Sequence, residues 1–134
     1  MCVIDTNVII YHMMGNHPVY SPRCDELFLA LQSGNVTAYG AITVVSEAAY
    51  VLEKGFRIPR ADIARALGDI VSMPAIQWDS REPLIEALQF WGSQGPLSFT
   101  DCYHLAISKY LDIGCVYAFD KKMGRYPGVT RIEP

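Results

Sequence analysis

The first seven residues constrain the fold more than any other stretch of the chain. Met1 to Ile4 form a short apolar segment, and Asp5, Thr6 and Asn7 follow it directly. A short apolar strand that ends in a carboxylate is typical of an open α/β sheet, which places its binding sites at the carboxyl ends of its strands. The opening segment therefore predicts an α/β fold with a polar site at the end of the first strand.

Length and composition favour one domain over residues 1–134. Of the 134 residues, 51% are hydrophobic and 19% are charged, which suits a well-filled core and leaves little room for disorder. A chain of this size buries roughly two thirds of the surface that it exposes when unfolded. Its apolar runs are too short to span a bilayer, and its start lacks the pattern of a secretory signal. We therefore expect a cytoplasmic protein with no membrane contact.

Charge and cysteine content argue against two classes of protein. The formal net charge of −3 does not fit an avid binder of nucleic acid, which normally carries a basic surface, unless bound cations offset the charge. The cysteines form no Cys-x-x-Cys pair, and three of the four lie in apolar stretches, which argues against a disulfide framework. They are Cys2, Cys24, Cys102 and Cys115.

Apolar periodicity, punctuated by glycine and proline, predicts alternating helices and short strands. Helices are expected over residues 6–14, from 21 to about 33, over 43–54 and 61–73, from 80 to about 95, and over 102–111. Strands are expected over residues 3–4, 36–39, 74–78, 115–119 and 129–132. The alternation favours a parallel sheet that helices cover on both faces, and the first and fourth strands are expected to be buried.

Four acids stand beside apolar runs, at strand ends or helix starts. An unpaired carboxylate costs several kcal/mol to bury, and no Lys or Arg directly precedes any of the four. A divalent cation would remove that cost, and oxygen donors without a His or Cys cluster favour Mg²⁺ or Mn²⁺ over Zn²⁺. Such a centre can activate water against a phosphodiester. The acids are Asp5, Glu47, Asp101 and Asp120.

Each acid also has a purely structural interpretation, because spacing alone does not show that the four converge. Asp5 and Asp120 could be turn residues at strand ends. Glu47 could be a solvated helix residue, and Asp101 could simply favour the positive end of its helix. Hydroxyl and amide residues beside the acids could be helix caps: Thr6, Asn7 and Thr100.

Other candidate functional residues carry weaker signals. His104 lacks the spacing of a metal ligand, and an ordinary helix histidine is the better interpretation of it than a proton shuttle. Trp78 and Trp91 could stack on bases, although core packing is the better interpretation. A basic segment after the fourth strand could hold phosphates or form a solvated loop: Lys121, Lys122 and Arg125.

Four stretches, in order over nearly the whole chain, resemble the motifs of PIN-domain ribonucleases. They are VIDTNVII, TVVSEAAYVL, LSFTDCYHLA and YAFDKKM. The greatest similarity is to the toxin ribonucleases of VapBC-type toxin–antitoxin pairs, and the first and third motifs are the more specific. The resemblance implies a three-layer α/β/α PIN-like fold with a central five-stranded parallel sheet in the order 3-2-1-4-5.

The resemblance also assigns roles to residues of this chain. It implies that Asp5, Asp101 and Asp120 bind the principal metal ion and that Glu47 helps to bind it or a second ion. All four would then be catalytic. Thr6 and Asn7 match the polar pair that steadies the first acid, and we also consider a supporting role for Thr100 and His104. His104 is a departure, since the family more often has a small or apolar residue there.

The implied activity is Mg²⁺- or Mn²⁺-dependent hydrolysis of single-stranded RNA by a toxin that dimerises and is silenced by a cognate antitoxin protein. A PIN nuclease of RNA processing is an alternative, and a DNA flap nuclease is a lesser one because the chain is short. A phosphoacceptor signalling domain also has acids at strand ends, but paired acids would follow its first strand. An inactive metal-binding scaffold is the remaining alternative.

Overall fold

Helices alternate with short strands along the chain, and the predicted α/β class is confirmed. The computed structural model describes residues 1–93 and 95–134. Its α-helices are α1 (Thr6–Met14), α2 (Tyr20–Gln32), α3 (Ile42–Tyr50), α4 (Arg60–Val71), α5 (Arg81–Ser93) and α6 (Phe99–Tyr110). A π-helical turn, η1 (Val51–Gly55), extends α3, and a 3₁₀ turn, η2 (Lys121–Arg125), follows the fourth strand. None of the helices described is long and apolar enough to cross a membrane.

The strands form two separate parallel sheets. In the first, β1 (Cys2–Val3) pairs with β2 (Ala38–Gly40), which pairs with β3 (Ile76–Trp78). In the second, β4 (Cys115–Tyr117) pairs with β5 (Thr130–Ile132). These pairings reproduce the 3-2-1 and 4-5 parts of the predicted order. The single five-stranded sheet is not formed, because β1 and β4 do not pair within the described residues.

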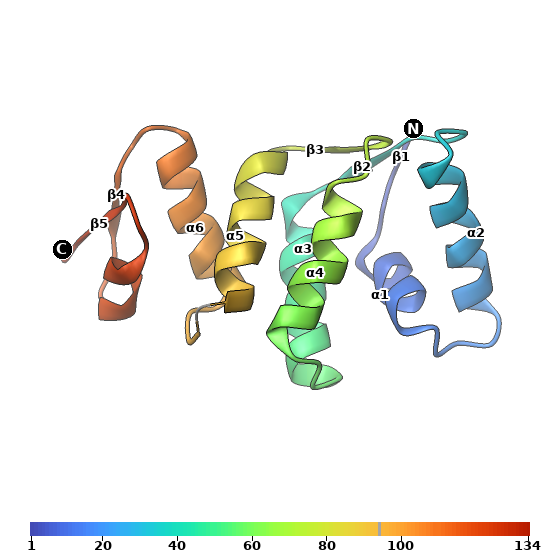
Figure 1. Ribbon diagram of the computed structural model, residues 1–134, viewed down its shortest axis with the longest axis horizontal. Helices are drawn as coiled ribbons and strands as arrows, with labels where there is room; N and C mark the ends of the chain where they lie inside the picture. The colour runs from blue at the N-terminus through green and yellow to red at the C-terminus, as the bar shows by residue number, and fades with distance from the viewer. Residues whose placement is uncertain (94) are drawn as a thin grey trace.

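Helices separate the two sheets. Figure 1 shows β1, β2 and β3 on one side of α5 and α6, and the β4–β5 pair on the other. Side chains from η2 and from the turn before β5 attach that pair to the helices: Met123, Tyr126 and Val129 are each no more than 6% exposed. The ring of Tyr126 lies 4.5 Å from that of Phe90 on α5. The β4–β5 pair is therefore a packed part of the molecule.

The apolar core draws on all the helices and on β3. Both tryptophans belong to it, since Trp78 is 7% exposed and Trp91 is 1% exposed. Their interpretation as packing residues is confirmed. The largest fully buried side chains are Ile9, Leu31, Val45, Leu52, Ile63, Leu67, Val71, Ile76, Leu84, Leu88, Trp91 and Leu105.

The prediction that the first and fourth strands are buried is wrong for three of their residues. Val3 is 71% exposed, Tyr117 is 74% exposed and Phe119 is 71% exposed, although Ile4 is buried at 4%. Because β1 and β4 do not pair, both are outer strands of small sheets, and neither lies in the middle of a sheet covered by helices on both faces.

The third helix also differs from its prediction. The pattern predicts one helix over residues 43–54, but α3 ends at Tyr50 and the chain widens into η1. There the amide of Phe56 donates to the carbonyl of Val51 at 3.1 Å, which is the longer spacing of a π turn. This wider turn precedes the loop that leads to α4.

The buried cysteines behave as small apolar side chains. Cys24 and Cys102 are buried, Cys2 is exposed and Cys115 is half-buried, and all four are free thiols. Burial raises the pKa of Cys102 to about 12, because its thiolate would lose hydration, and the neighbouring Asp101 carboxylate adds to this effect. Cys102 is therefore protonated at neutral pH.

We expect Gly40→Ala to destabilise the protein by about 1–3 kcal/mol, because an added methyl group would overlap the buried ring of Trp78. Gly68→Ala is the matched control. Its added methyl meets open space on the helix α4, so it should stabilise by up to about 1 kcal/mol. Urea unfolding measures both changes. Equal stability of Gly40→Ala and the parent chain would contradict the close packing of β2 on β3.

Candidate functional site

Asp5 connects the first strand to the first helix. Its backbone is extended, with φ −85° and ψ 152°, and its carboxylate accepts a hydrogen bond from the amide of Asn7 at 3.1 Å. Asp5 is therefore the N-cap of α1, so the expectation that Thr6 or Asn7 caps this helix is wrong. The Asp5 side chain is exposed, which removes the burial cost that its position in the sequence suggested.

Thr6 joins this strand end to α3. The Thr6 side chain is buried, with 5% of its surface exposed, and its hydroxyl donates to Oε2 of Glu47 at 2.8 Å. Thr6 thus orients the Glu47 carboxylate towards the end of β1. The supporting role that the resemblance gave to Thr6 therefore has a direct partner in the structure, although that partner is Glu47.

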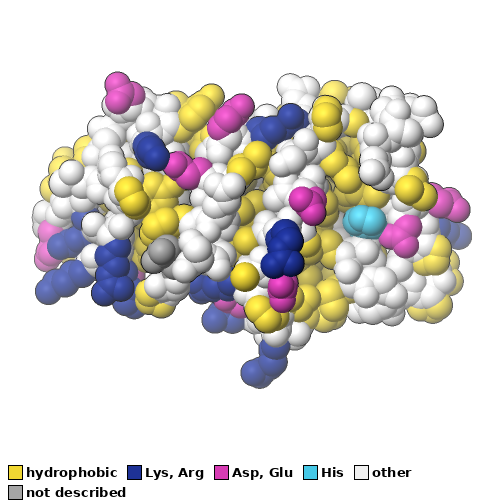
Figure 2. Space-filling view, in the orientation of Figure 1, with side chains coloured by type: hydrophobic (Ala, Val, Ile, Leu, Met, Phe, Trp, Pro, Cys, Tyr) yellow, Lys and Arg dark blue, Asp and Glu magenta, His cyan; other side chains and the backbone are white. Residues whose placement is uncertain are grey.

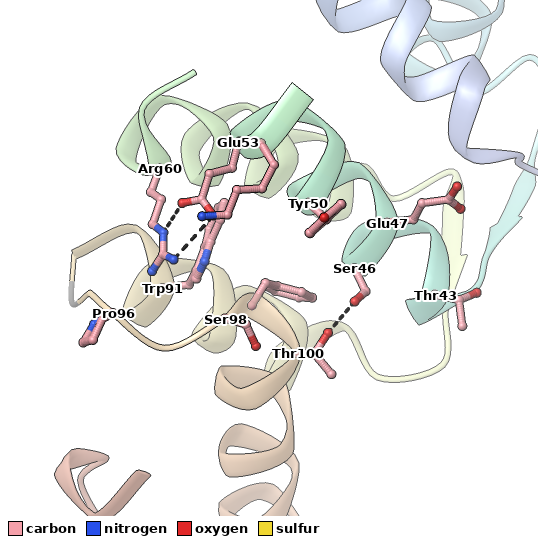
Figure 3. A pocket seen from close by; sticks show the side chains of 12 residues that line it. Thr43, Ser46, Glu47, Tyr50, Glu53, Arg60, Trp91, Pro96, Ser98 and Thr100 are labelled. Carbon is pink, nitrogen blue, oxygen red and sulfur yellow. Dashed lines mark hydrogen bonds and ion pairs between the residues drawn. The ribbon is translucent and has the colours of Figure 1, made fainter. Parts of the chain in front are cut away.

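A second pair of hydroxyl groups joins α3 to α6. Oγ of Ser46 lies 2.6 Å from Oγ1 of Thr100, and Figure 3 shows the two side chains facing each other. Asp101 follows Thr100 in the first turn of α6. The cap of this helix is Ser98, whose hydroxyl accepts from the amide of Asp101 at 3.1 Å. The interpretation of Thr100 as the cap is wrong, because Thr100 lies inside the helix.

Asp120 is not part of this network. It follows β4 in the second sheet, is exposed, and caps η2 by accepting from the amide of Lys122 at 2.9 Å. Residues 1–93 and 95–134 contain no group of three or more His, Cys, Asp or Glu side chains that could hold a metal ion. The carboxylates of the candidate acids are nevertheless donors that suit a divalent ion.

A pocket of about 640 Å³ opens beside Glu47, whereas Asp5, Asp101 and Asp120 do not line it. Glu47 and Thr100 border it, so it adjoins the contacts that hold α3 and α6 together (Figure 3). Tyr50 also lines it, with 68% of its surface exposed. The full lining is Thr43, Ser46, Glu47, Tyr50, Glu53, Lys54, Arg60, Trp91, Pro96, Ser98, Phe99 and Thr100.

An ion pair closes the far end of this pocket. The Arg60 guanidinium donates to the Glu53 carboxylate, and its Nη1 donates to the carbonyl of Leu97 at 2.7 Å. The guanidinium carbon lies 5.1 Å from the ring centre of Trp91, within the range of a cation–π contact. The hydrogen bond from Arg60 lowers the pKa of Glu53 below its ordinary value, against the opposing effect of partial burial.

Sequence reasoning missed Tyr50, Glu53 and Arg60. Glu53 lies in the π turn and Arg60 begins α4 after a loop, so no helical spacing relates them. Of the weaker candidates, His104 and Lys121 are exposed. The assigned roles of His104, Asn7 and the basic segment remain predictions.

Parallel strands with acids at their carboxyl ends, next to an open pocket, define the class of α/β proteins whose site lies at the strand ends. Within this class, the PIN domain model matches residues 2–129. The chain belongs to the PIN-domain family. No curated protein matches the chain. Proteins of the PIN family are in general metal-dependent nucleases, and they typically use divalent ions.

The Glu53–Arg60 pair predicts a pH-dependent contribution to stability. Because the folded-state pKa of Glu53 is lowered, its stabilisation is complete above the ordinary pKa of 4.5 and is lost as the pH falls through the lower, folded-state value. At pH 7 we expect Glu53→Gln to cost about 1–3 kcal/mol. Urea unfolding at pH 7 and pH 3 should show this cost shrinking in acid.

Asp62→Asn is the control for this measurement. Asp62 pairs with Arg65 on the exposed face of α4, at 3.5 Å. Its replacement should change the free energy of unfolding little at either pH. A cost of Glu53→Gln that is the same at both pH values would contradict the assigned charge interaction.

Proposed function

We propose that this protein is an endoribonuclease that hydrolyses phosphodiester bonds of single-stranded RNA with Mg²⁺ or Mn²⁺, as the toxin of a VapBC-type toxin–antitoxin pair. In this proposal Asp5, Glu47, Asp101 and Asp120 are the catalytic, metal-binding acids. One observation carries it. The Thr6–Glu47 and Ser46–Thr100 hydrogen bonds tie together the three elements that hold Asp5, Glu47 and Asp101, in a chain of the PIN family.

We expect Thr6, Glu47 and Asp101 to have different roles in the site. Thr6 fixes one oxygen of Glu47, so the other oxygen is free to face the site. Asp101 stands in the first turn of α6, at the positive end of the helix dipole. Carboxylate oxygens are the donors that Mg²⁺ and Mn²⁺ prefer. The site becomes complete only when Asp120 joins the other three acids.

The pocket supports RNA in single-stranded form as the substrate. Its volume of about 640 Å³ lies within the usual range for small-molecule sites, which suits a nucleotide unit better than a rigid duplex. Tyr50 exposes its ring there, and an unpaired base can stack on an aromatic face. Lys54 lines the same pocket and could meet a phosphate. The net charge of −3 is consistent with modest affinity for RNA in the absence of cations.

The toxin assignment includes two partners, an antitoxin protein and a second copy of the chain. Exposed apolar side chains support protein contacts, since Leu29 is 65% exposed and Tyr110 is 56% exposed. A short neighbouring gene for a small DNA-binding protein would support the toxin assignment over a PIN nuclease of RNA processing.

Purified protein should cleave unstructured RNA with Mg²⁺ or Mn²⁺, and EDTA should abolish the cleavage. Asp5→Asn should lower the rate by roughly 100-fold or more, because it removes one of the charged oxygens on which the site depends. Asp62→Asn is the control, since Asp62 is an exposed acid on α4 outside the site. Cleavage that persists in EDTA, or equal loss in both variants, would overturn the proposal.

Thr6 provides a sharper test of the geometry. Thr6→Val keeps the shape of the buried side chain but removes the hydroxyl that orients Glu47, so the cleavage rate should fall by roughly 10- to 100-fold. Thr6→Ser keeps the hydroxyl and should retain most of the activity. Equal rates for the two variants, with the fold intact by circular dichroism, would show that the contact does not position Glu47.

A further inference from the structure

We propose that β1 of one copy of this chain pairs in parallel with β4 of a second copy, and the reverse. Each acid site would then contain Asp5, Glu47 and Asp101 of one chain and Asp120 of the other. The role of the shared site rests on the proposed function, whereas the strand pairing rests on the structure alone. The exchange would convert the separate sheets of each chain into two five-stranded sheets shared by the dimer.

The outer edge of β1 offers free backbone groups. The amide of Ile4 donates to the carbonyl of Tyr39 at 2.9 Å, so the even-numbered residues of this segment direct their amides to β2. Because these directions alternate along a strand, the amide and carbonyl of Val3 face away from the sheet. Among the described strands β1 pairs only with β2, so no strand covers this edge. Val3 as a whole is 71% exposed.

The outer edge of β4 also offers backbone groups, although the carbonyl of Cys115 already accepts from the Ser108 hydroxyl and that of Phe119 from the Arg131 guanidinium. The amide of Ala118 donates to the carbonyl of Ile132 at 3.0 Å, so the amides of Tyr117 and Phe119 face away from β5. Both side chains are more than 70% exposed. An apolar strand edge that is open to water readily pairs with another chain.

One register satisfies both edges. With Val3 opposite Ala118 in a parallel pair, the amide and carbonyl of Val3 bond to the two neighbours of Ala118, which are the residues with outward groups. The same register places Asp5 opposite Asp120, because each lies two residues further along its strand. The pairing that completes the backbone hydrogen bonds therefore also brings the fourth acid to the site.

A second copy fits this edge better than the chain's own β4. Ser108 on α6 is buried and makes two hydrogen bonds to the turn before β4. The Ser108 carbonyl accepts from the amide of Ile113 at 2.9 Å, and the Ser108 hydroxyl donates to the carbonyl of Cys115 at 2.8 Å. These bonds fix the turn before β4, and Tyr126 packs against Phe90 behind it. Swinging β4 to the β1 of its own chain would break these contacts, whereas a second copy can pair without breaking them.

Two lysines beside Asp120 offset the like charge of Asp5 and Asp120, which the proposed register places opposite each other. Lys121 and Lys122 follow Asp120 directly and are exposed, and Figure 2 shows dark blue side chains gathered at the end of the molecule where Figure 1 draws the last part of the chain. Asp5 and Glu47 are exposed beside β1. The proposed register brings the lysines of one copy towards the acids of the other, which favours association.

Exposed apolar residues near the two edges also favour a dimer. Five large apolar residues in or beside β1 and β4 are exposed and could be buried in such a dimer, whose standard interface covers roughly 800 Å² per partner. In a reciprocal exchange each chain covers both edges of the other. The residues are Met1, Val3, Ile113, Tyr117 and Phe119, each at least 59% exposed.

Complementation between two inactive variants tests the shared site. Asp5→Asn and Asp120→Asn should each be inactive alone. In a dimer of one chain of each kind, isolated through two different affinity tags, one site carries both substitutions and the other carries none. We expect about half of the wild-type cleavage rate per dimer. The control dimer of Asp5→Asn with Glu47→Gln has one substitution in each site and should stay inactive.

The outcomes separate this inference from the proposed function. Active wild-type protein that shows no complementation, or no dimer that carries both tags, overturns the strand exchange and leaves the nuclease proposal intact. Wild-type protein that cleaves no RNA with Mg²⁺ or Mn²⁺ overturns the nuclease proposal. The strand exchange is then decided by a cross-link that needs no activity.

The cross-link uses a native cysteine. The proposed register places Cys2 of one chain opposite Tyr117 of the other, at the strand spacing of about 4.8 Å that a disulfide can bridge. Mild oxidation of Tyr117→Cys should give a covalent dimer whose linked peptides contain positions 2 and 117. The same substitution combined with Cys2→Ser should not give that link. A 2–117 link within one chain, or none, overturns the exchange.

Discussion

A strand edge leaves backbone amides and carbonyls without partners, and this constraint governs the arrangement of the whole molecule. Helices α3 to α6 keep β1 and β4 apart, so each strand has one unpaired edge. Tyr117 belongs to β4, one of these two strands, and is 74% exposed. The open strand edges and the separation of Asp120 from Asp5 are therefore consequences of one missing strand pairing.

The linked part of the site depends on two contacts between side chains far apart in the sequence. Thr6 to Glu47 spans 41 residues and Ser46 to Thr100 spans 54. Each contact involves a residue next to an acid or an acid itself, so small hydroxyl groups place the larger charged groups. Asp5, Glu47 and Asp120 are exposed, so water solvates their charges in a single copy.

Local features of the sequence predicted the elements well. Apolar periodicity located α1, α4 and α6 to within a few residues, because each helix buries one face. The order of the four motifs predicted the family. Errors arose where two local signals compete: Thr100 and Ser98 are both good caps, and the residues around Val51 suit an α-helix as well as the π turn that forms.

The sequence by itself determined the α/β class, the family and the identities of the candidate acids, because these depend on residue type and on spacing along one element. Tertiary structure decided which acids lie together, because that depends on helix packing across long separations. It also revealed the Glu53–Arg60 pair on Trp91 and the open edges of β1 and β4. Strand pairing between distant segments is set by the packing of whole layers, which no local pattern encodes.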